Sequence, residues 1–410
     1  MNFLTLNSSW LDISQQPFEI VERKGLGHPD TLADGLADAI SIAYSRYCLG
    51  KFGVVLHHNL DKVYIGGGHF TCDYGSRTML APIKVVVNGR ISNTMDGLAI
   101  DVRAIQKDAV VSYLKQLLPH LDTDEHLDIC PNATQHTQRN HWFSPRSIED
   151  LPEQSKLTAN DTSLCVAYAP LSTCELLSIA LEQTLWVVQE DGRRIPRWPD
   201  IGQDIKVMIL RNGNRIDVTL CVPFISNLVN SHDYYQQRVR EIEATIQDRA
   251  DSIAGKNCRI SVQVNTAERL YMLGVGSCIE CGEEGIVGRG NSSGGFIAAG
   301  RPHSMEAAFG KNPVYHTGRV LGYLTQKLAW AIYRETGSPN VIHSLTTNGG
   351  NLIPPDRLII STATDVPRST IVEIIERDFL AADYLSEILM MPSVFRALDF
   401  ADNYLIKEVV

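Results

Sequence analysis

A hairpin signal in the middle of the chain constrains the fold more than any other feature. Two β-rich runs, residues 207–210 and 216–224, flank the dipeptide Asn212-Gly213, which is a strong signal for a hairpin turn. Apolar residues at helical spacing follow and predict a helix from about Asp233 to Ala250. The sequence therefore predicts an antiparallel hairpin that is followed by an amphipathic helix.

The same order of elements occurs twice more. The first copy has β-rich runs at residues 62–67 and 83–87 with a helix at about 101–118, and the last has runs at 341–346 and 358–361 with a helix that begins near residues 367–370. We therefore predict a mixed α/β (α+β) protein of three similar strand-hairpin-helix units in a pseudo-threefold arrangement, with approximate boundaries at residues 16–130, 131–260 and 261–410. The stretches share a pattern and no residue-level identity, so convergent local folding rules remain an alternative explanation.

The composition limits the partners of the chain. Its 410 residues are 44% hydrophobic and 20% charged, enough for a large core, and carry a formal net charge of −10. A negative charge without a dense basic block gives no attraction to nucleic acid or to an anionic membrane surface. No run approaches the roughly 18 apolar residues of a membrane span, and the N-terminus lacks a basic leader with an apolar core. We therefore expect a cytoplasmic protein that binds neither nucleic acid nor membranes.

The cysteines are scattered singly, except for the pair Cys278 and Cys281. Nine thiols without dense, even spacing are unlike a secreted disulfide framework, so we expect them to be reduced. The CxxC pair could form half of a zinc site, but no second pair or histidine partner stands at ligand spacing. Buried thiols are the favoured interpretation.

A glycine-containing loop leads into a helical pattern near the N-terminus. Gly25-Leu26-Gly27-His28-Pro29-Asp30 precedes apolar residues at helical spacing, and a helix N-terminus beside an imidazole suits a phosphate or another anion. Asp30 would oppose that anion unless Mg²⁺ lies between them. A plain helix cap is the simpler interpretation of this loop. Asp34 and Asp38 follow on the same helical face, where they either meet a positive group or, as we favour for Asp38, form a solvated acidic stripe.

Two further polar groups lie next to apolar runs. Asn160, Asp161 and Ser163 stand just before the run LCVAYAPL, where local turns explain them adequately, although they could also present a carboxylate to an amine or a ribose. Lys206 stands inside a β-rich run, and it is either an edge residue that points to water, the favoured interpretation, or a cation aimed into a site.

The segment from Gly282 to His316 has the most features of a binding site. It contains many glycines together with Arg289, Arg301 and Lys311, a combination that suits a polyphosphate. The spacing matches neither a P-loop nor a Rossmann fingerprint. A flexible glycine-rich loop with incidental charges is an equally good explanation from these residues alone.

Taken together and in this order, the motifs resemble the archaeal-type S-adenosylmethionine synthetases over nearly the whole chain. The stretches that carry the resemblance are VERKGLGHPDTLADGLADAI, LHHNLDKVYIGGG, ANDTSLCVAYAPLS, DIKVMILRNG, VNTAERLYML, GIVGRGN and RPHSMEAAFGKNPVYH. The resemblance implies three interleaved α/β units and a homodimer, with a dimer of dimers as a further option, whose active sites lie between subunits. It also implies that ATP and L-methionine are converted to S-adenosylmethionine, phosphate and diphosphate, with Mg²⁺ and, as an option, K⁺.

The resemblance also implies residue roles. His28 would lie at the phosphate end of ATP, Asp30 would bind magnesium, and the catalytic cations Lys206, Arg289 and Lys311 would hold the triphosphate. The positions of Asp161, with its neighbours Asn160 and Ser163, and of Glu283 are implied to contact substrate, and Glu283 would face the amino acid.

The sequence departs from the family at several of these places. Glu283 and Glu284 stand where the pattern has aspartates, and Ser292 stands where archaeal members have arginine. The segments 135–140 and TTNGGNLIPP also differ from the usual stretches, so a modified methionine is a conceivable substrate. Two other functions remain open: a Mg-dependent phosphohydrolase that ignores methionine, and an ATP-binding or partner-binding homologue without activity.

Overall fold

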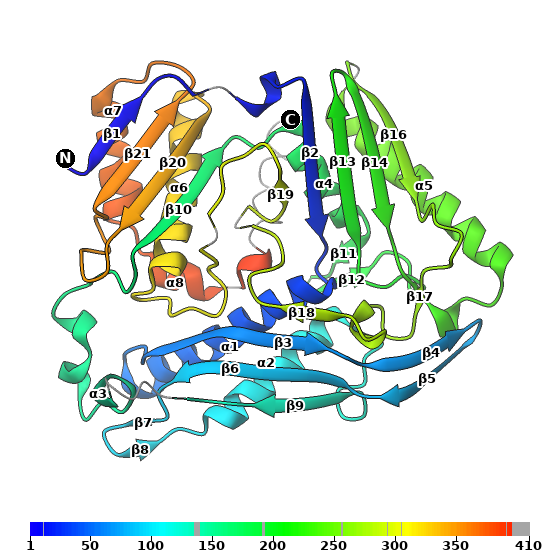
Figure 1. Ribbon diagram of the computed structural model, residues 1–410, viewed down its shortest axis with the longest axis horizontal. Helices are drawn as coiled ribbons and strands as arrows, with labels where there is room; N and C mark the ends of the chain where they lie inside the picture. Colours follow the sequence, from blue (N-terminus) through cyan, green and yellow to red (C-terminus); the bar gives the residue numbers. More distant parts are fainter. Residues whose placement is uncertain are drawn as a thin grey trace.

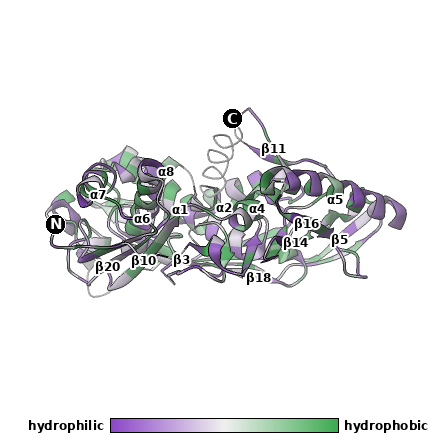
Figure 2. Ribbon diagram, turned by 90° about the horizontal axis from the view of Figure 1, so that it is seen from above, coloured by the Kyte–Doolittle hydropathy of each residue, from purple (hydrophilic) through white to green (hydrophobic). Residues whose placement is uncertain are grey.

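Three β-sheets of four or five strands, each with helices on one side, form the main part of the fold (Figure 1). The computed structural model describes residues 1–10, 12–134, 140–190, 193–255, 257–292, 294–304, 306–390 and 392–395. Figure 2 shows the strands of the three sheets along one side of the molecule and the helices along the other. The arrangement confirms the predicted mixed α/β fold of three similar units.

The central hairpin forms as its sequence predicts. Strands β13 (Lys206–Asn212) and β14 (Arg215–Cys221) pair antiparallel around Gly213, which has the positive φ of 58° that the turn requires. Helix α5 (His232–Ala254) follows and leads to β16 (Arg259–Val264), which lies parallel to β14. Two strands from distant parts of the chain, β2 (Phe18–Lys24) and β19 (Ile297–Ala298), complete the order β16-β14-β13-β2-β19.

The other two sheets repeat this plan. One has the order β18-β3-β6-β9 and the other β1-β21-β20-β10. Their bounds are β18 (Glu284–Ile286), β3 (His58–Gly66), β6 (Ile83–Ile91), β9 (Leu127–Pro131), β1 (Leu4–Asn7), β21 (Arg357–Thr362), β20 (Asn340–Thr346) and β10 (Ser163–Ala169). Each sheet contains one antiparallel hairpin and one parallel edge strand, β16, β9 or β1. Since β1, β2 and β18 join sheets far from their neighbours in sequence, the units interleave, and the linear boundaries at residues 130 and 260 stay a prediction.

Helices fill the space behind each sheet. They are α1 (Pro29–Phe52), α2 (Val102–Leu117), α4 (Thr173–Thr184), α5, α6 (Thr317–Thr336), α7 (Arg368–Ile375) and α8 (Tyr384–Met390). The predicted helices at 101–118 and 233–250 correspond to α2 and α5, and the helix predicted to begin near residues 367–370 corresponds to α7. Buried apolar side chains form one large cluster behind the first two sheets and a second cluster between α6, α7 and the sheet that contains β20. Burial of these faces supplies the main driving force for folding.

Short elements connect these layers. They are β4 (His69–Asp73), β5 (Ser76–Ala81), β7 (Thr94–Met95), β8 (Leu98–Ala99), β11 (Trp186–Val188), β12 (Arg194–Pro196), β15 (Phe224–Ile225), β17 (Met272–Leu273), α3 (Asn140–Phe143) and, among the described residues, the short helical turns Ile13–Gln15, Ile148–Asp150, Pro152–Gln154, Ser226–Leu228, Cys278–Glu280 and Glu376–Leu380. The segment 130–160 contains α3 and two of these turns, and residues 135–139 lie outside the described part of the chain. None of the helices within the described ranges is long and apolar enough to cross a membrane.

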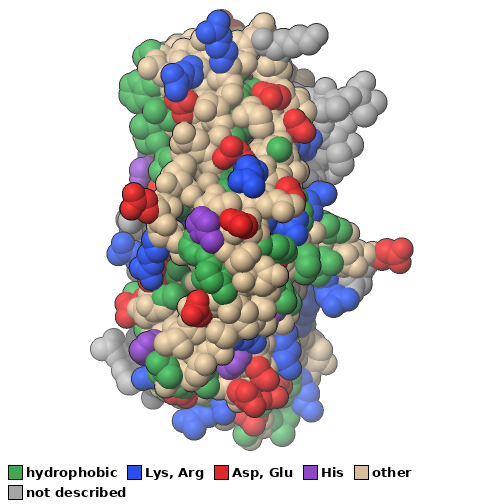
Figure 3. All heavy atoms as spheres, turned by 90° about the vertical axis from the view of Figure 1, so that its right-hand side faces the viewer, with side chains coloured by type: hydrophobic (Ala, Val, Ile, Leu, Met, Phe, Trp, Pro, Cys, Tyr) green, Lys and Arg blue, Asp and Glu red, His purple; other side chains and the backbone are tan. Residues whose placement is uncertain are grey.

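The side of the sheets that carries no helices combines apolar and charged side chains. On β2, Glu19 and Val21 are buried, whereas Phe18 and Ile20 are 56% and 37% exposed, as expected for a strand with one open face. Leu210 lies opposite Ile20 in the register. The charged side chains of this face, Glu22, Lys24 and Lys206, lie at the other end of the same strands. Figure 3 shows a further surface, one end of the molecule, where basic and acidic side chains are interspersed.

Candidate active site

The Gly-His-Pro-Asp turn is fixed against the backbone that precedes β13. Gly25 N–H donates to the Ile205 carbonyl at 2.7 Å and Gly27 N–H donates to the Gln203 carbonyl at 3.0 Å. A Cβ on Gly27 would lie 2.4 Å from the Gln203 carbonyl carbon, so no larger residue fits without displacing this backbone. The glycines therefore allow this turn to pack closely against the backbone of residues 203–205, and this packing positions the N-terminus of α1 next to Lys206.

His28 caps α1 as the simpler interpretation predicted, and it also faces charged groups. Its Nδ1 accepts from the Asp30 N–H at 3.2 Å. Burial, against the opposing effect of Asp30 and with help from Lys24 and Lys206, lowers the pKa of His28 to about 4. The ring is therefore neutral at pH 7. Because Nδ1 is the acceptor, Nε2 carries the proton and can donate it to an anion.

Asp30 lies between a lysine and the glycine-rich segment. Its Oδ2 is 3.0 Å from Lys24 Nζ, and its Oδ1 accepts from the Ile286 N–H at 3.2 Å. Lys24 Nζ also donates to the Arg289 carbonyl at 2.6 Å, and Asn291 bonds the Lys24 backbone at both its N–H and its carbonyl. These contacts hold the start of α1, the end of β2 and residues 286–291 together as one site.

Lys206 belongs to this site, and its interpretation as a sheet-edge residue is wrong. Strand β13 is paired on both sides, and Lys206 lies directly opposite Lys24 on β2. Lys206 Nζ is 2.9 Å from Glu22 Oε1, and both side chains lie on the helix-free face of the sheet. Lys24 and Glu22 are the members that the sequence interpretation missed. The alternation along β2, which places Glu22 and Lys24 on one face just before the Gly-His-Pro-Asp turn, could have identified them.

The glycine-rich segment contributes Arg289 and two glutamates. Arg289, Glu283 and Glu284 are exposed, and Glu284 accepts from the Tyr64 hydroxyl at 3.3 Å. Ser292, at the position where arginine was expected, donates its hydroxyl to the Phe296 carbonyl at 2.5 Å. Its side chain thus closes the local turn.

Arg301 is not part of the cation group, although the sequence placed it in the same polyphosphate segment. It is buried against Glu175, with Nη2 2.8 Å from Oε2, and its guanidinium carbon lies 4.2 Å from the ring centre of Tyr168. This arginine joins α4 to β10. Its position indicates a structural pair and not an exposed phosphate contact.

The two aspartates on α1 after Asp30 are both buried. Asp38 accepts from Arg319 Nη1 at 2.6 Å and from the N–H groups of Gly310 and Ser393, so its interpretation as a solvated stripe is wrong. Asp34 accepts from the Gly288 N–H at 2.8 Å, and burial raises its pKa well above the usual range. Both side chains bind the glycine-rich segment to α1 and thereby fix its position.

A second group of candidate residues lies elsewhere in the chain. Lys311 is buried and pairs with Glu306, and its charge helps to lower the pKa of His316, after the larger effect of burial. Asn160 Oδ1 accepts from the Thr317 N–H at 2.7 Å and so caps α6. Asp161 is exposed and accepts from the Thr162 N–H at 2.7 Å, and Ser163 begins β10.

Strand β3 separates the two groups. Asn59 near its start bridges to Lys311, whereas Gly66 at its end pairs with Glu284. Seven residues of strand place these points about 20 Å apart. Within one chain, Lys311 therefore lies about the length of this strand away from Glu284.

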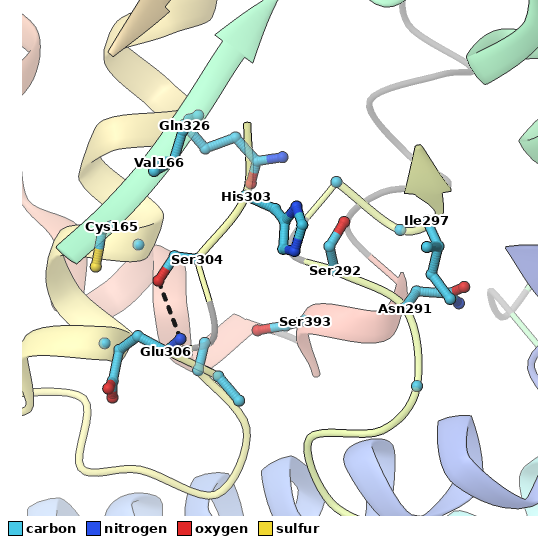
Figure 4. A pocket seen from close by; sticks show the side chains of 18 of the residues that line it. Cys165, Val166, Asn291, Ser292, Ile297, His303, Ser304, Glu306, Gln326 and Ser393 are labelled. Atoms are coloured by element: carbon cyan, nitrogen blue, oxygen red, sulfur yellow. Dashed lines mark hydrogen bonds between the residues drawn. The ribbon is translucent and has the colours of Figure 1, made fainter. Parts of the chain in front are cut away.

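One cavity lies between the two groups, and another lies beside the second group. One of about 330 Å³ lies between β10, α6 and residues 288–309, and Figure 4 shows Cys165 and Gln326 on one side of it with Asn291 and Ile297 on the other. Ser304 Oγ accepts from the Glu306 N–H at 3.0 Å at its margin. The second cavity, of about 420 Å³, contains Asn160 and His316 together with the aromatic residues His57, Trp142, Phe143 and Tyr315.

The acidic residues at the first group fit a magnesium ion only in part. Within the described ranges, no cluster of three or more His, Cys, Asp or Glu side chains could hold a metal by itself. Mg²⁺ is commonly bound by one or two carboxylates, with water and substrate phosphates as the remaining ligands. Asp30 is 13% exposed and Glu22 is 24% exposed, and both face the cations that would hold a triphosphate. This donor set fits magnesium that arrives with a nucleotide.

Comparison with known proteins agrees with the resemblance seen in the sequence. The profile of the family described as S-adenosylmethionine synthetase (AdoMet synthetase) matches residues 2–377. An uncharacterised protein of Streptococcus pyogenes serotype M3 is 39% identical over 379 residues, which cover 91% of this chain and 93% of that protein. The S-adenosylmethionine synthase of Hyperthermus butylicus is 37% identical over 331 residues, 78% of each chain, and that of Methanospirillum hungatei is 34% identical over 380 residues, 90% of each chain. The chain therefore belongs to the S-adenosylmethionine synthetase family.

Proposed function

We propose that this protein transfers the adenosyl group of ATP to L-methionine and hydrolyses the bound triphosphate to phosphate and diphosphate. The observation that carries the proposal is that His28 and Lys206 meet at the N-terminus of α1, where Lys24 holds the Arg289 backbone, in a chain that belongs to this family. These groups bring positive charge and hydrogen-bond donors to one place without a general base. The reaction requires that combination.

The chemistry explains the arrangement. The thioether sulfur is already a nucleophile, so its attack on the ribose C5′ needs no proton removal. The leaving triphosphate accumulates negative charge as the C–O bond breaks, and fixed cations stabilise that charge more in the transition state than in the ground state. Lys24 and Lys206 lie opposite each other on adjacent strands, while neutral His28 presents its Nε2–H to the same anion. Rigid positioning of these donors avoids their reorganisation during the reaction.

We assign the magnesium ligand to Asp30. A bound Mg²⁺ would supply further charge neutralisation at the phosphates. Lys24 now pairs with Asp30, and we infer that it turns to the triphosphate when the nucleotide and metal bind. Potassium is a further ion whose requirement the assay below measures.

We propose that the active site is completed by a second copy of the chain. Two observations support this. The strand β3 places the contact point of Lys311 about 20 Å from that of Glu284. The helix-free face of the sheet is also apolar. Phe18, Ile20, Met208, Leu210 and Ile297 are 36–56% exposed there. A contiguous apolar surface of this kind is typical of a subunit interface. In the resulting homodimer, Lys311, Asn160, Asp161 and Ser163 of one subunit would meet His28 and Glu283 of the other.

The first experiment follows both products. Purified protein is incubated with ATP, Mg²⁺ and L-methionine, with and without K⁺, and S-adenosylmethionine is measured by mass spectrometry together with phosphate release. A parallel reaction lacks methionine. Methionine-dependent formation of both products supports the proposal. Phosphate release that ignores methionine would instead indicate a phosphohydrolase, and ATP binding without any product would indicate an inactive homologue or a different amino-acid substrate.

Variants then test the two residue groups separately. Asp30→Asn and Lys311→Met should each reduce turnover sharply while circular dichroism shows an unchanged fold. If the site is shared between subunits, a mixture of the two inactive variants should regain part of the activity after subunit exchange, because each mixed dimer contains one intact site and one doubly altered site. Near-normal rates of both variants alone would contradict the assigned roles.

A further inference from the structure

The paired cysteines adjoin the active-site segment and have no role in the proposed reaction. Cys278 begins a short 3₁₀ turn, Cys278–Glu280, and the Cys281 N–H closes it by donating to the Cys278 carbonyl at 2.9 Å. The two side chains also interact, because each shifts the pKa of the other thiol. Cys278 is partly buried and Cys281 is exposed, which corrects the interpretation of both as buried thiols.

The surroundings hold one cysteine rigidly and leave the other accessible. The Cys278 N–H donates to Asp204 Oδ2 at 2.8 Å, and its sulfur is 3.2 Å from the Tyr271 hydroxyl. Between the cysteines, the Glu280 carboxylate accepts the Val275 N–H at 2.5 Å and is buried. The turn is thus anchored at Cys278 and Glu280, and Cys281 leads directly into the exposed Gly282.

We propose that Cys278 and Cys281 form a redox-active dithiol, a modification site at which a small-molecule disulfide converts the pair to an internal disulfide. The 3₁₀ turn and its backbone hydrogen bond hold the two cysteines next to each other, so disulfide closure needs only a small movement of the more exposed member. The other exposed cysteines of the described chain, Cys130 and Cys221, lie on separate strands and have no such neighbour.

The chemistry requires one disulfide, RSSR, as oxidant. The Cys281 thiolate attacks one sulfur of RSSR, forms a mixed disulfide and expels RS⁻. Cys278 then loses its proton and attacks the Cys281 sulfur, which forms the internal disulfide and expels the second RS⁻. The two thiolates take up the two protons, so the protein dithiol is oxidised by two electrons and RSSR is reduced to two RSH.

The electrostatics assign the order of attack. The hydrogen bond with Cys278 lowers the pKa of the Cys281 thiol against the opposing effect of burial, whereas the same bond and burial raise the pKa of Cys278. An exposed thiol with a lowered pKa is the better nucleophile. Cys281 is therefore the attacking residue and Cys278 the resolving residue.

The disulfide would change the position of a residue at the substrate site. This consequence rests on the proposed function. Only Gly282, whose φ is +82°, separates Cys281 from Glu283, whose carbonyl accepts from the Gly67 N–H at 3.3 Å. Movement of Cys281 toward Cys278 would displace Glu283, the residue expected to face the amino acid. Oxidation should therefore lower kcat/KM for methionine at least tenfold, and a reducing agent should restore it.

Mass spectrometry tests the modification without any assay of activity. The protein is incubated with oxidised glutathione, unreacted thiols are alkylated, and the tryptic peptide of residues 270–289, whose only cysteines are Cys278 and Cys281, is analysed. The expected wild-type product lacks two hydrogen atoms and carries no alkyl group or glutathione. Cys278→Ser should instead trap glutathione on Cys281, whereas Cys281→Ser should carry none.

The outcomes separate the dithiol from the proposed function. If the wild-type peptide stays a dithiol or carries two glutathiones, the dithiol proposal is overturned, whether or not the protein makes S-adenosylmethionine. If the disulfide forms and methionine-dependent turnover is unchanged, its control of Glu283 is overturned. Cys221→Ser is the control variant, and its oxidation and turnover should match those of the wild type.

Discussion

Gly285 on β18 packs directly against Pro29 at the start of α1. A Cβ at Gly285 would lie 1.9 Å from the Pro29 carbonyl oxygen, and the neighbouring Ile286 N–H donates to Asp30. The glycine thus allows the segment with Glu283 and Arg289 to lie against the Gly-His-Pro-Asp turn. The relative position of these two segments depends on the absence of one side chain.

Gly285→Ala should therefore separate the two segments. We expect kcat/KM to fall at least about tenfold and the free energy of unfolding to fall by about 1–3 kcal/mol, the usual cost of overpacking. Steady-state kinetics and urea denaturation measure both effects. Gly50→Ala is the control, since a Cβ at Gly50 in α1 would have no neighbouring atom within 4 Å, and this change should be neutral or stabilising. Wild-type kinetics for Gly285→Ala would contradict the packing argument.

Lys24 should be as important for turnover as Lys206. Lys24→Met removes a charge that lies opposite Lys206 and 3.0 Å from Asp30, so we expect kcat to fall by about 10²-fold, the effect of losing one transition-state donor. Binding of ATP should weaken less than kcat falls. Lys51→Met, at the exposed far end of α1, serves as the control and should retain wild-type turnover. An active Lys24→Met enzyme would remove this lysine from the triphosphate site.

The buried pair of Asp38 and Arg319 should be a structural requirement. Arg319→Met leaves a buried carboxylate without its cation, and we expect the free energy of unfolding to fall by about 3–5 kcal/mol. Adding Asp38→Asn to this variant should recover part of the loss, because the uncompensated charge is removed. Urea denaturation of the two variants provides the comparison, and equal stability of the single and double variants would argue against the charge effect.

The buried carboxyl of Asp204 predicts a pH-dependent stability. Burial raises its pKa to about 7, so between about pH 4 and 7 the folded protein binds a proton that the unfolded chain has lost. The stabilisation that the protonated Asp204 carboxyl gives the folded protein is therefore fully present at low pH and is lost as the pH rises through about 7. As the pH rises over this range, Asp204→Asn should gain stability relative to the wild type, by an amount on the order of a few kcal/mol. Each unit of pKa shift corresponds to about 1.4 kcal/mol in the free energy of unfolding. Urea denaturation at several pH values measures the difference, and a constant difference would contradict the raised pKa.

The apolar sheet face should hold the dimer together. Leu210→Glu introduces a charge beside Ile20 on the helix-free face, and we expect at least a tenfold weaker self-association with loss of turnover. Val188→Glu is the matched control, because Val188 is 58% exposed on β11 in a separate two-stranded sheet. Sedimentation measurements compare the two variants. A Leu210→Glu protein that stays dimeric would exclude this face as the interface.

Local patterns in the sequence determined much of the fold. The hairpin around Gly213, the helix from His232 to Ala254 and the helix that follows Asp30 all depend on periodicity and turn residues that neighbours in sequence supply. The family was likewise readable from the motifs, since their order along the chain survives divergence. His28, Lys206 and Arg289 could be named as candidates for the same reason.

Only the tertiary structure decided which of these residues meet. Lys206 lies in a central strand because β2, from near the N-terminus, pairs with β13, and that pairing also places Lys24 opposite Lys206. Asp38 is buried beside Arg319, 281 residues away in the sequence, and Lys311 and Glu284 contact opposite ends of β3. Such contacts depend on long-range pairing whose energy comes from burial and from charge compensation. A local pattern does not contain that information, and so the sequence determined the elements and the candidate residues, whereas packing determined the site.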